Sequence, residues 1–206
     1  AGYLKDNGIK VRIDDLEMKY WDTNILRFNA LKGFMGSLPN RINNPKRVFK
    51  SQGKVKSYLY DNLDSPGMNR VLKDWEKLLG NEFMNFSYVG FSIMGFGQLS
   101  TSLCFAKYLK EKYGLKIILG GVFLTRRMVD LLKSFGFIDF IIIQEAETAL
   151  KDLLSHKELS SIPNIIYRRD KKAVINNVEN IYCDDSLPYM HDLPLGLYRR
   201  EGILLI

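Results

Sequence analysis

Residues 116–143 read KIILGGVFLTRRMVDLLKSFGFIDFIII, and they hold two nearly continuous aliphatic runs separated by a helical pattern. The runs, 116–119 and 140–143, do not alternate apolar with polar residues, which indicates strands that are covered on both faces. Between them four apolar residues recur at helical spacing from Met128 to Phe135, and Gly136 is expected to end that helix. Strand, helix and buried strand in this order predict a parallel sheet with helices on each side.

The same alternation of elements extends to both sides of this stretch. We expect a strand at 88–94 and a helix at about 98–113, then a strand at 116–120 and a helix at about 125–135, then a strand at 138–143 and a helix at about 147–155. A hairpin follows, with strands at 164–168 and 172–175 around a polar turn at Asp170-Lys171. The predicted fold class is α/β, a doubly wound, flavodoxin- or Rossmann-like parallel sheet with helices on both faces.

The first 85 residues are less regular. A short helix at 2–6, stopped by Asn7-Gly8, precedes an expected strand at 10–14, and because such a helix cannot bury its face alone we expect a further strand before it. Residues 16–85 are interpreted as a largely helical insertion, with loop at 32–53 and an amphipathic helix at 66–79 that begins at Ser65-Pro66 and stops at Gly80. The predicted domain covers 1–182, and 183–206 are interpreted as a linker.

Composition narrows the class of protein. With 206 residues, of which 46% are hydrophobic, the chain can bury a sizeable core, and no apolar run reaches the roughly 20 residues that cross a bilayer. The two cysteines, Cys104 and Cys183, are too few for a disulfide framework and are not spaced as metal ligands, so a cytoplasmic location is expected. The net charge of +7 includes a basic run at 41–56, which is typical of a solvated loop.

Residues of unusual type follow three successive predicted strands. Because the carboxyl ends of parallel strands meet at one edge of a sheet, the segments 94–98, 120–123 and 144–147 are expected to lie together there. Glycines in the first two permit close approach of a ligand to backbone. The chain has no phosphate-loop motif and no third glycine of a dinucleotide fingerprint, and neither of its histidines, His156 and His191, lies near a nucleophile or a metal cluster. No catalytic or metal-ligating residue is predicted.

Several short segments, taken in order, resemble the cobalamin-binding domain that precedes the catalytic barrel in many radical S-adenosylmethionine enzymes. They are VGFSIM at 89–94, LGGV at 119–122, IDFIIIQEAE at 138–147, IPNIIYR at 162–168 and DSLP at 185–188. The opening YLKDNGIKV at 3–11 is also similar to the first helix and second strand of that family. The resemblance covers 1–14 and 88–194, and it rests on the order and spacing of the segments rather than on any single one.

The resemblance implies that the chain binds cobalamin and presents it to a radical S-adenosylmethionine barrel for methyl transfer or another radical reaction. In that family Ser92 and Met94 would lie beside the nucleotide tail, Gly120 and Gly121 would let the cofactor pass close to backbone, and Glu145 and Glu147 would border the corrin. The full set of implied cofactor-binding residues is Ser92, Met94, Gly95, Phe96, Gly97, Gln98, Gly120, Gly121, Val122, Phe123, Glu145, Ala146 and Glu147.

The chain departs from the family pattern in three respects. Ala146 stands where the family often has glycine, a cobalt-ligating histidine would precede Ala1, and the three-cysteine motif of an iron–sulfur cluster is absent. The segment is therefore interpreted as a non-catalytic domain, whose expected partner is the C-terminal barrel of a parent enzyme that carries a [4Fe-4S] cluster and S-adenosylmethionine. The substrate is not predicted, and neither membrane nor nucleic acid is an expected partner.

Two other hypotheses remain open. In the first, the same fold carries no cofactor and serves as a docking module for a peptide, protein or nucleic acid, using the basic run at 41–56 and the amphipathic helix at 66–79; the bulky Phe96 and Phe123 would then fill the pocket. In the second, the chain is a nucleotide- or flavin-binding relative of flavodoxin, which the missing phosphate loop disfavours.

Overall fold

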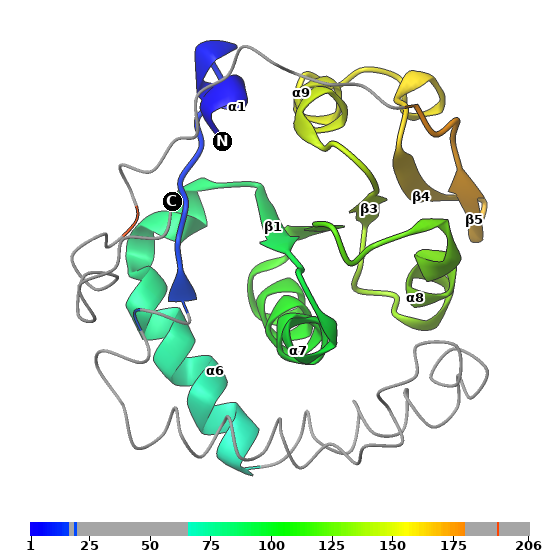
Figure 1. The fold of residues 1–206 in the computed structure, drawn as a ribbon. Coiled ribbons are helices and arrows are strands. Elements are labelled where there is room, and N and C mark those ends of the chain that lie inside the picture. The colour runs from blue at the N-terminus through cyan, green and yellow to red at the C-terminus, as the bar shows by residue number, and fades with distance from the viewer. Residues whose placement is uncertain (17–18, 20–65, 180–192, 194–206) are drawn as a thin grey trace, which may run out of the picture.

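A five-stranded mixed sheet forms the centre of the protein in a computed structural model, which describes residues 1–16, 19, 66–179 and 193. The strands lie in sequence order (Figure 1). The first three, β1 (Tyr88–Ser92), β2 (Lys116–Gly120) and β3 (Phe140–Ile142), are parallel. The last two, β4 (Ile165–Arg169) and β5 (Lys172–Ile175), are antiparallel. The chain is thus an α/β protein, and the expectation of a parallel sheet is correct only for its first three strands.

The α-helices of the described residues agree with the sequence pattern, except that the helix expected at about 125–135 begins only at Val129. They are α1 (Gly2–Asp6), α6 (Pro66–Leu79), α7 (Phe96–Tyr113), α8 (Val129–Ser134) and α9 (Glu147–Leu154). Short 3-10 helices lie at η2 (Asn81–Asn85), η3 (Arg126–Met128) and η4 (Leu159–Ser161). Figure 1 shows α7, α8 and α9 nearly end-on, with α7 and α8 on one side of the sheet and α9 on the other. No helix in the described ranges combines the length and apolar character needed to span a membrane.

Two apolar clusters explain why successive residues of strands β2 and β3 are apolar. Ile117 and Leu119 point into a cluster shared with α6, α7 and α8, whereas Ile118, between them, joins a second cluster with α9. Strand β3 divides in the same way, with Ile141 in the first cluster and Ile142 in the second. Because successive side chains of a strand point to opposite faces, a strand that is covered twice has no position for a polar residue.

The hairpin that closes the sheet was predicted correctly. Strand β4 turns into β5 through Asp170 and Lys171, whose φ angles of 51° and 64° are those of a tight two-residue connection. Such a turn necessarily makes its two strands antiparallel, so β4, which pairs with β3 in the opposite direction, converts the sheet from parallel to mixed.

The strand expected at 10–14 is not found, and this prediction was wrong. Residues 9–15 form neither a helix nor part of the described sheet. Instead the Arg12 side chain donates a hydrogen bond of 2.8 Å to the carbonyl of Leu79, at the end of α6, and forms an ion pair of 2.8 Å with Asp14. Apolar and polar residues alternate here as in a strand, but regular β structure also requires a hydrogen-bonded neighbour, and none lies beside this segment in the described part of the chain.

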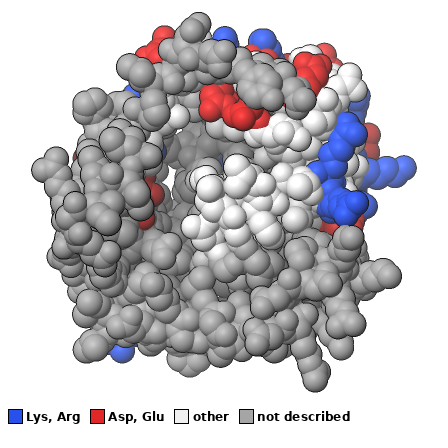
Figure 2. All heavy atoms as spheres, viewed as in Figure 1, with Lys and Arg blue, Asp and Glu red and all other residues white. Residues whose placement is uncertain are grey.

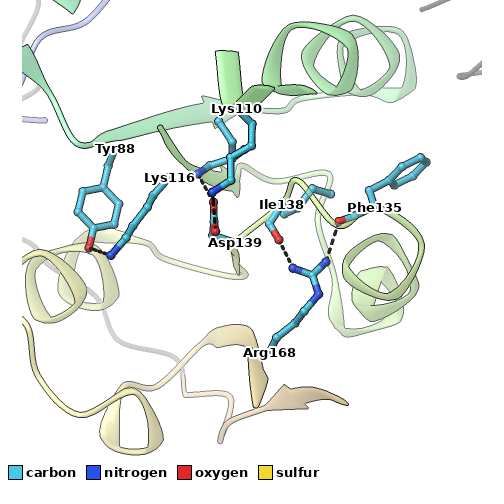
Figure 3. Close-up of polar contacts among 8 residues, drawn as sticks. Tyr88, Lys110, Lys116, Phe135, Ile138, Asp139 and Arg168 are labelled. Carbon is cyan, nitrogen blue, oxygen red and sulfur yellow. Dashed lines mark hydrogen bonds and ion pairs between the residues drawn. The ribbon is translucent and has the colours of Figure 1, made fainter. Parts of the chain in front are cut away.

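Helix α8 ends differently from the prediction. It stops at Ser134, and Gly136 does not adopt the left-handed conformation of a glycine stop. The guanidinium of Arg168, on β4, reaches the end of the helix instead and donates hydrogen bonds to the carbonyls of Leu132 and Phe135, the latter at 2.7 Å. Figure 3 shows the bond to Phe135 together with one to the carbonyl of Ile138. A distant cation therefore satisfies the last carbonyls of α8. Burial lowers the pKa of Arg168, although nearby Asp139 opposes the shift.

The amino ends of β2 and β3 are joined by a charged side chain. Asp139 accepts two hydrogen bonds from Lys110 of α7, at 2.8 and 2.9 Å, and one of 2.7 Å from the backbone N–H of Ile117 (Figure 3). These contacts lie at the edge of the sheet opposite to the candidate site, and we interpret them as structural.

Several sequence predictions fall outside the described residues. They concern the loop at 32–53, the basic run at 41–56, Ser65 as a helix cap, Cys183, His191 and the linker at 183–206. The insertion at 16–85 is described only at Leu16, Lys19 and from Pro66 onward, where the expected amphipathic helix is confirmed as α6.

Candidate functional site

The carboxyl ends of β1, β2 and β3 lie side by side, as the sequence predicted for three parallel strands. Ser92, the last residue of β1, is opposite Gly120, the last residue of β2. The pairing of Leu119 with Ile141 carries the same alignment on to β3. The segments that follow the three strands therefore start from one edge of the sheet, where open α/β sheets bind their ligands.

Backbone hydrogen bonds tie the segment after β1 to the segment after β2. Ile93 donates to the carbonyl of Gly120 at 2.8 Å, and Phe123 donates back to the carbonyl of Ile93 at 3.2 Å. A third bond, of 3.0 Å, runs from Leu124 to the carbonyl of Gly121 and tightens the turn after β2. Ile93, Leu124 and the half-buried Phe123 also pack into the apolar cluster on the α7 side. The two segments thus form one fixed unit.

Gly121 is required by this unit. Its φ is +106°, and a Cβ atom there would lie 2.5 Å from both the nitrogen and the oxygen of Ile93. The close backbone approach that the sequence suggested for a ligand is therefore made at this position by the protein itself. At Gly120 a Cβ would meet the carbonyl oxygen of Ile142 at an ordinary 3.9 Å, and at Gly95 it would meet nothing within 4 Å.

Two large apolar side chains project from the fixed unit into solvent. Met94, next to Ile93, is 63% exposed, and Val122, between Gly121 and Phe123, is 77% exposed. Four large apolar side chains in the described ranges are exposed, the other two being Met84 at 51% and Ile175 at 37%. Two of these four residues therefore lie just after the ends of two paired strands.

Polar groups lie beside the apolar pair. The side-chain oxygen of Gln98, in the first turn of α7, accepts a hydrogen bond of 2.7 Å from the backbone N–H of Met94. After β3, Gln144 adopts a positive φ of 60° and is exposed, as is Glu145. Sequence reasoning did not select Gln144, because nothing in its neighbours signals a left-handed backbone at that position.

The remaining predicted residues have different surroundings. Ser92 is exposed, Ala146 is half-buried against the apolar cluster on the α9 side, and Glu147 is the first residue of α9, where its charge is favourable next to the helix N-terminus. Phe96 and Gly97 open α7, two residues earlier than expected, and their side chains lie outside the described structure.

Titratable groups of catalytic or metal-binding type do not gather at this edge in the part of the chain that is described. No set of three or more His, Cys, Asp or Glu residues there is arranged to hold a metal ion. The thiol of Cys104 is buried in the interior of α7, and burial raises its pKa to about 12, so it remains protonated at neutral pH. Figure 2 shows mostly uncharged atoms over the middle of the described surface, with carboxylates above and basic side chains to the right.

Comparisons with known proteins leave the family open. No model of a known protein family matches the chain, and a search of curated proteins finds no significant match. The functional argument therefore rests on the residues and their arrangement.

Proposed function

We propose that the chain binds a corrinoid of the cobalamin type across the carboxyl ends of β1, β2 and β3. The observation that carries this proposal is the exposed pair Met94 and Val122, held on a backbone that is fixed by hydrogen bonds to its neighbour strand. A large, flat macrocycle needs an apolar platform on which to rest, and a platform that is ordered before binding costs less free energy to occupy.

Each part of the edge has a task in this proposal. Met94 and Val122 contact the face of the ring, while Gln144 and Glu145 offer oxygen atoms to the amide groups at its rim. Gly95 leaves the backbone open to close approach, and Ser92 supplies a hydroxyl beside it. Gly121 acts indirectly, since it lets the backbone after β2 lie against Ile93 and so fixes the platform.

The chemistry would belong to the cofactor, and the chain would supply position. A bound cobalamin offers cobalt as a carrier of a methyl group or as a partner in radical chemistry. The chain's own residues orient the ring and cover one of its faces against water. The proposed partner is a radical S-adenosylmethionine barrel with a [4Fe-4S] cluster, and its substrate is undefined.

The proposal also takes the domain to be doubly wound, with residues 16–85 as an insertion. Three parallel strands, helices on opposite sides of the sheet and an apolar cluster on each face support this interpretation. In such folds the ligand lies outside the carboxyl ends of the strands, which is where the exposed pair is found.

The test is retention of hydroxocobalamin by the purified chain after desalting, followed by the visible spectrum. We expect a retained corrin band for the wild type and at least about tenfold weaker binding for Met94→Glu and Val122→Glu, because a carboxylate on the platform must be desolvated. Met84→Glu is the matched control, since Met84 is 51% exposed but lies in η2. A clean protein spectrum from folded wild type would refute the proposal.

A cofactor-free docking module is the second candidate, and the same exposed pair favours it because apolar side chains on a fixed backbone also suit a peptide. This hypothesis would use the apolar face of α6 for docking. That face is not accessible, because Leu72, Trp75 and Leu79 are buried in the apolar core. A protein spectrum without a corrin band, combined with peptide binding that is lost in Met94→Glu, would favour this candidate.

A further inference from the structure

Met94 and Gly95 form the joint between β1 and α7, and few contacts within the described residues restrain it. Met94 is 63% exposed and belongs to neither apolar cluster. Gly95 has an extended backbone, with φ −166° and ψ 174°, and a Cβ atom there would meet nothing within 4 Å. Because glycine has few steric limits on its backbone, this joint would turn easily unless another contact fixed it.

A hydrogen bond to the side chain of Gln98 is the contact that fixes the joint. The Oε1 atom of Gln98 accepts from the backbone N–H of Met94 at 2.7 Å. A side-chain amide accepts through its oxygen and donates through its nitrogen, so a bond from an N–H group requires the oxygen to face Met94. Since Gln98 lies in the first turn of α7, the bond spans the joint from the helix to the segment after β1.

Both ends of the joint are anchored independently of this bond. On one side Ile93 is fully buried, and its N–H donates to the end of β2 at 2.8 Å. On the other side Leu99, next to Gln98, is 4% exposed, and its N–H donates to the carbonyl of Gly95 at 3.1 Å. Met94 therefore lies between a fixed strand end and a fixed helix start, and the side chain of Gln98 connects the two.

Helix capping alone does not describe this contact. Gly95 is the N-cap of α7 and has no side chain to cap it, and Gln98 is the third residue of the helix. A glutamine at that position commonly reaches back to the N–H of the N-cap residue itself. Here the bond passes over the N-cap and reaches Met94, which precedes the helix. The bond thus orients a residue of the candidate site as well as the start of α7.

We propose that Gln98 is a positioning residue, which holds the backbone of Met94 in place on the platform formed by Met94 and Val122 before the ligand binds. The inference rests on the proposed corrinoid function and assigns a role to a residue that acts through Met94. Ordering one side chain on binding costs enough free energy to weaken affinity by about three- to tenfold, and a joint that is fixed in advance avoids this cost. Because Gln98 acts through its oxygen, a glutamate at the same position should serve equally well.

Two variants of the full chain test this role, with hydroxocobalamin as the probe. Gln98→Leu removes the acceptor, and Gln98→Glu keeps an oxygen at the same reach. In equilibrium dialysis at pH 7 we expect Gln98→Leu to bind about three- to tenfold more weakly than the wild type, and Gln98→Glu to bind within about twofold of it. Wild-type affinity in Gln98→Leu would overturn the proposal. So would a loss of affinity in Gln98→Glu, because it would mean that the amide nitrogen is the group required.

Hydrogen exchange of the Met94 amide tests the bond itself, without any ligand. We expect exchange at least about tenfold faster in Gln98→Leu than in the wild type, and close to the wild-type rate in Gln98→Glu. The Ile93 amide, which is bonded to β2, should stay protected in all three proteins and so show that the end of β1 is intact. Unchanged exchange of Met94 in Gln98→Leu would contradict the proposal. Should Gln98→Leu fail to fold, Gln98→Ala provides the same comparison.

Asn7→Leu is the matched control. The side-chain amide of Asn7 donates to the carbonyl of Tyr3 at 2.8 Å at the end of α1, so this variant also loses one exposed bond between an amide and the backbone. It should keep wild-type affinity, and an equal loss there would mean that Gln98→Leu acts through general stability, against the proposal. A wild type that retains no hydroxocobalamin would refute the proposed function together with this role. Wild-type binding that Gln98→Leu leaves unchanged would refute the role of Gln98 alone.

Discussion

Strands β1 and β2 are neighbours of equal length that run in the same direction, yet they are buried to very different degrees. Ile117, Ile118 and Leu119 of β2 are at most 4% exposed, whereas β1 has no fully buried residue. Both strands contribute apolar side chains to the same cluster, so their composition does not account for the difference. What differs is position, because within the described residues β2 has a hydrogen-bonded strand on each side and β1 on one side only.

The comparison of β1 with β2 shows that one sheet can combine a strand whose central residues are buried with a neighbouring strand that is only partly buried. Strand β2 and its helices fix the backbone, while the side chains of β1 are only partly covered by the described residues. The corrinoid proposal uses β1 at its carboxyl end.

The largest expected effect comes from truncating the two strands at equivalent positions. Ile117→Ala removes a fully buried side chain and should lower the free energy of unfolding by about 3 to 4 kcal/mol. Val89→Ala, at the paired position of β1 but in half-buried surroundings, should cost about 1 kcal/mol. Urea denaturation followed by circular dichroism measures both. Equal losses would mean that β1 is as buried in solution as β2, which would contradict this comparison.

Two glycines sharpen the comparison. Gly121→Ala should destabilise the protein by about 2 to 3 kcal/mol, since an alanine there has a left-handed backbone and its Cβ clashes with Ile93. Gly90→Ala should leave stability within about 0.5 kcal/mol, because its Cβ has open space. The same denaturation experiment tests the pair, and a costly Gly90→Ala would show that an unseen neighbour covers β1.

The smallest effect concerns the contact between the helices that cover β1. Glu76 of α6 accepts hydrogen bonds from Tyr108 and Lys112 of α7, at 2.5 and 2.7 Å. Burial opposes ionisation, but these two bonds prevail and hold the pKa of Glu76 below its usual 4.5. A lowered pKa in the folded state stabilises the protein above pH 4.5, and this contribution is lost as the pH falls through the folded value.

Glu76→Gln should therefore be less stable than the wild type at pH 7 by no more than about 1 kcal/mol, since the pair is near the surface. The gap should close as the pH falls below 4.5. Tyr108→Phe, which removes one of the two bonds, should show part of the same effect. Urea titrations at a series of pH values from 7 downward measure the difference, and a gap that does not narrow at any pH below 4.5 would mean that Glu76 acts through packing.

The pattern of the sequence predicted most of the regular elements. Aliphatic runs located β2 and β3, helical spacing located α6 and α7, and Asp170-Lys171 located the hairpin turn. The predictions failed where an element depends on a distant group. Residues 10–14 have the alternation of a strand but lack a pairing neighbour in the described structure, and α8 is terminated by Arg168 rather than by Gly136.

The candidate site also has features that the local sequence predicted and features that depend on distant parts of the chain. The order of the strands placed the segments after β1, β2 and β3 at one edge, and Met94, Val122 and Glu145, which the resemblance implied, lie in those segments. The role of Gly121 could not, because only the path of the Ile93 backbone shows that this glycine accommodates the protein itself.

The sequence by itself determined the α/β class, the direction of β1 to β3 and the hairpin that ends the sheet, because hydrophobic periodicity and turn chemistry act over a few residues. Only the tertiary structure decided which strand lies at the edge of the described sheet, which described apolar side chains are exposed and which glycine is needed for packing. These properties depend on neighbours that are distant in the chain, and burial is a property of the assembled layers rather than of any one segment.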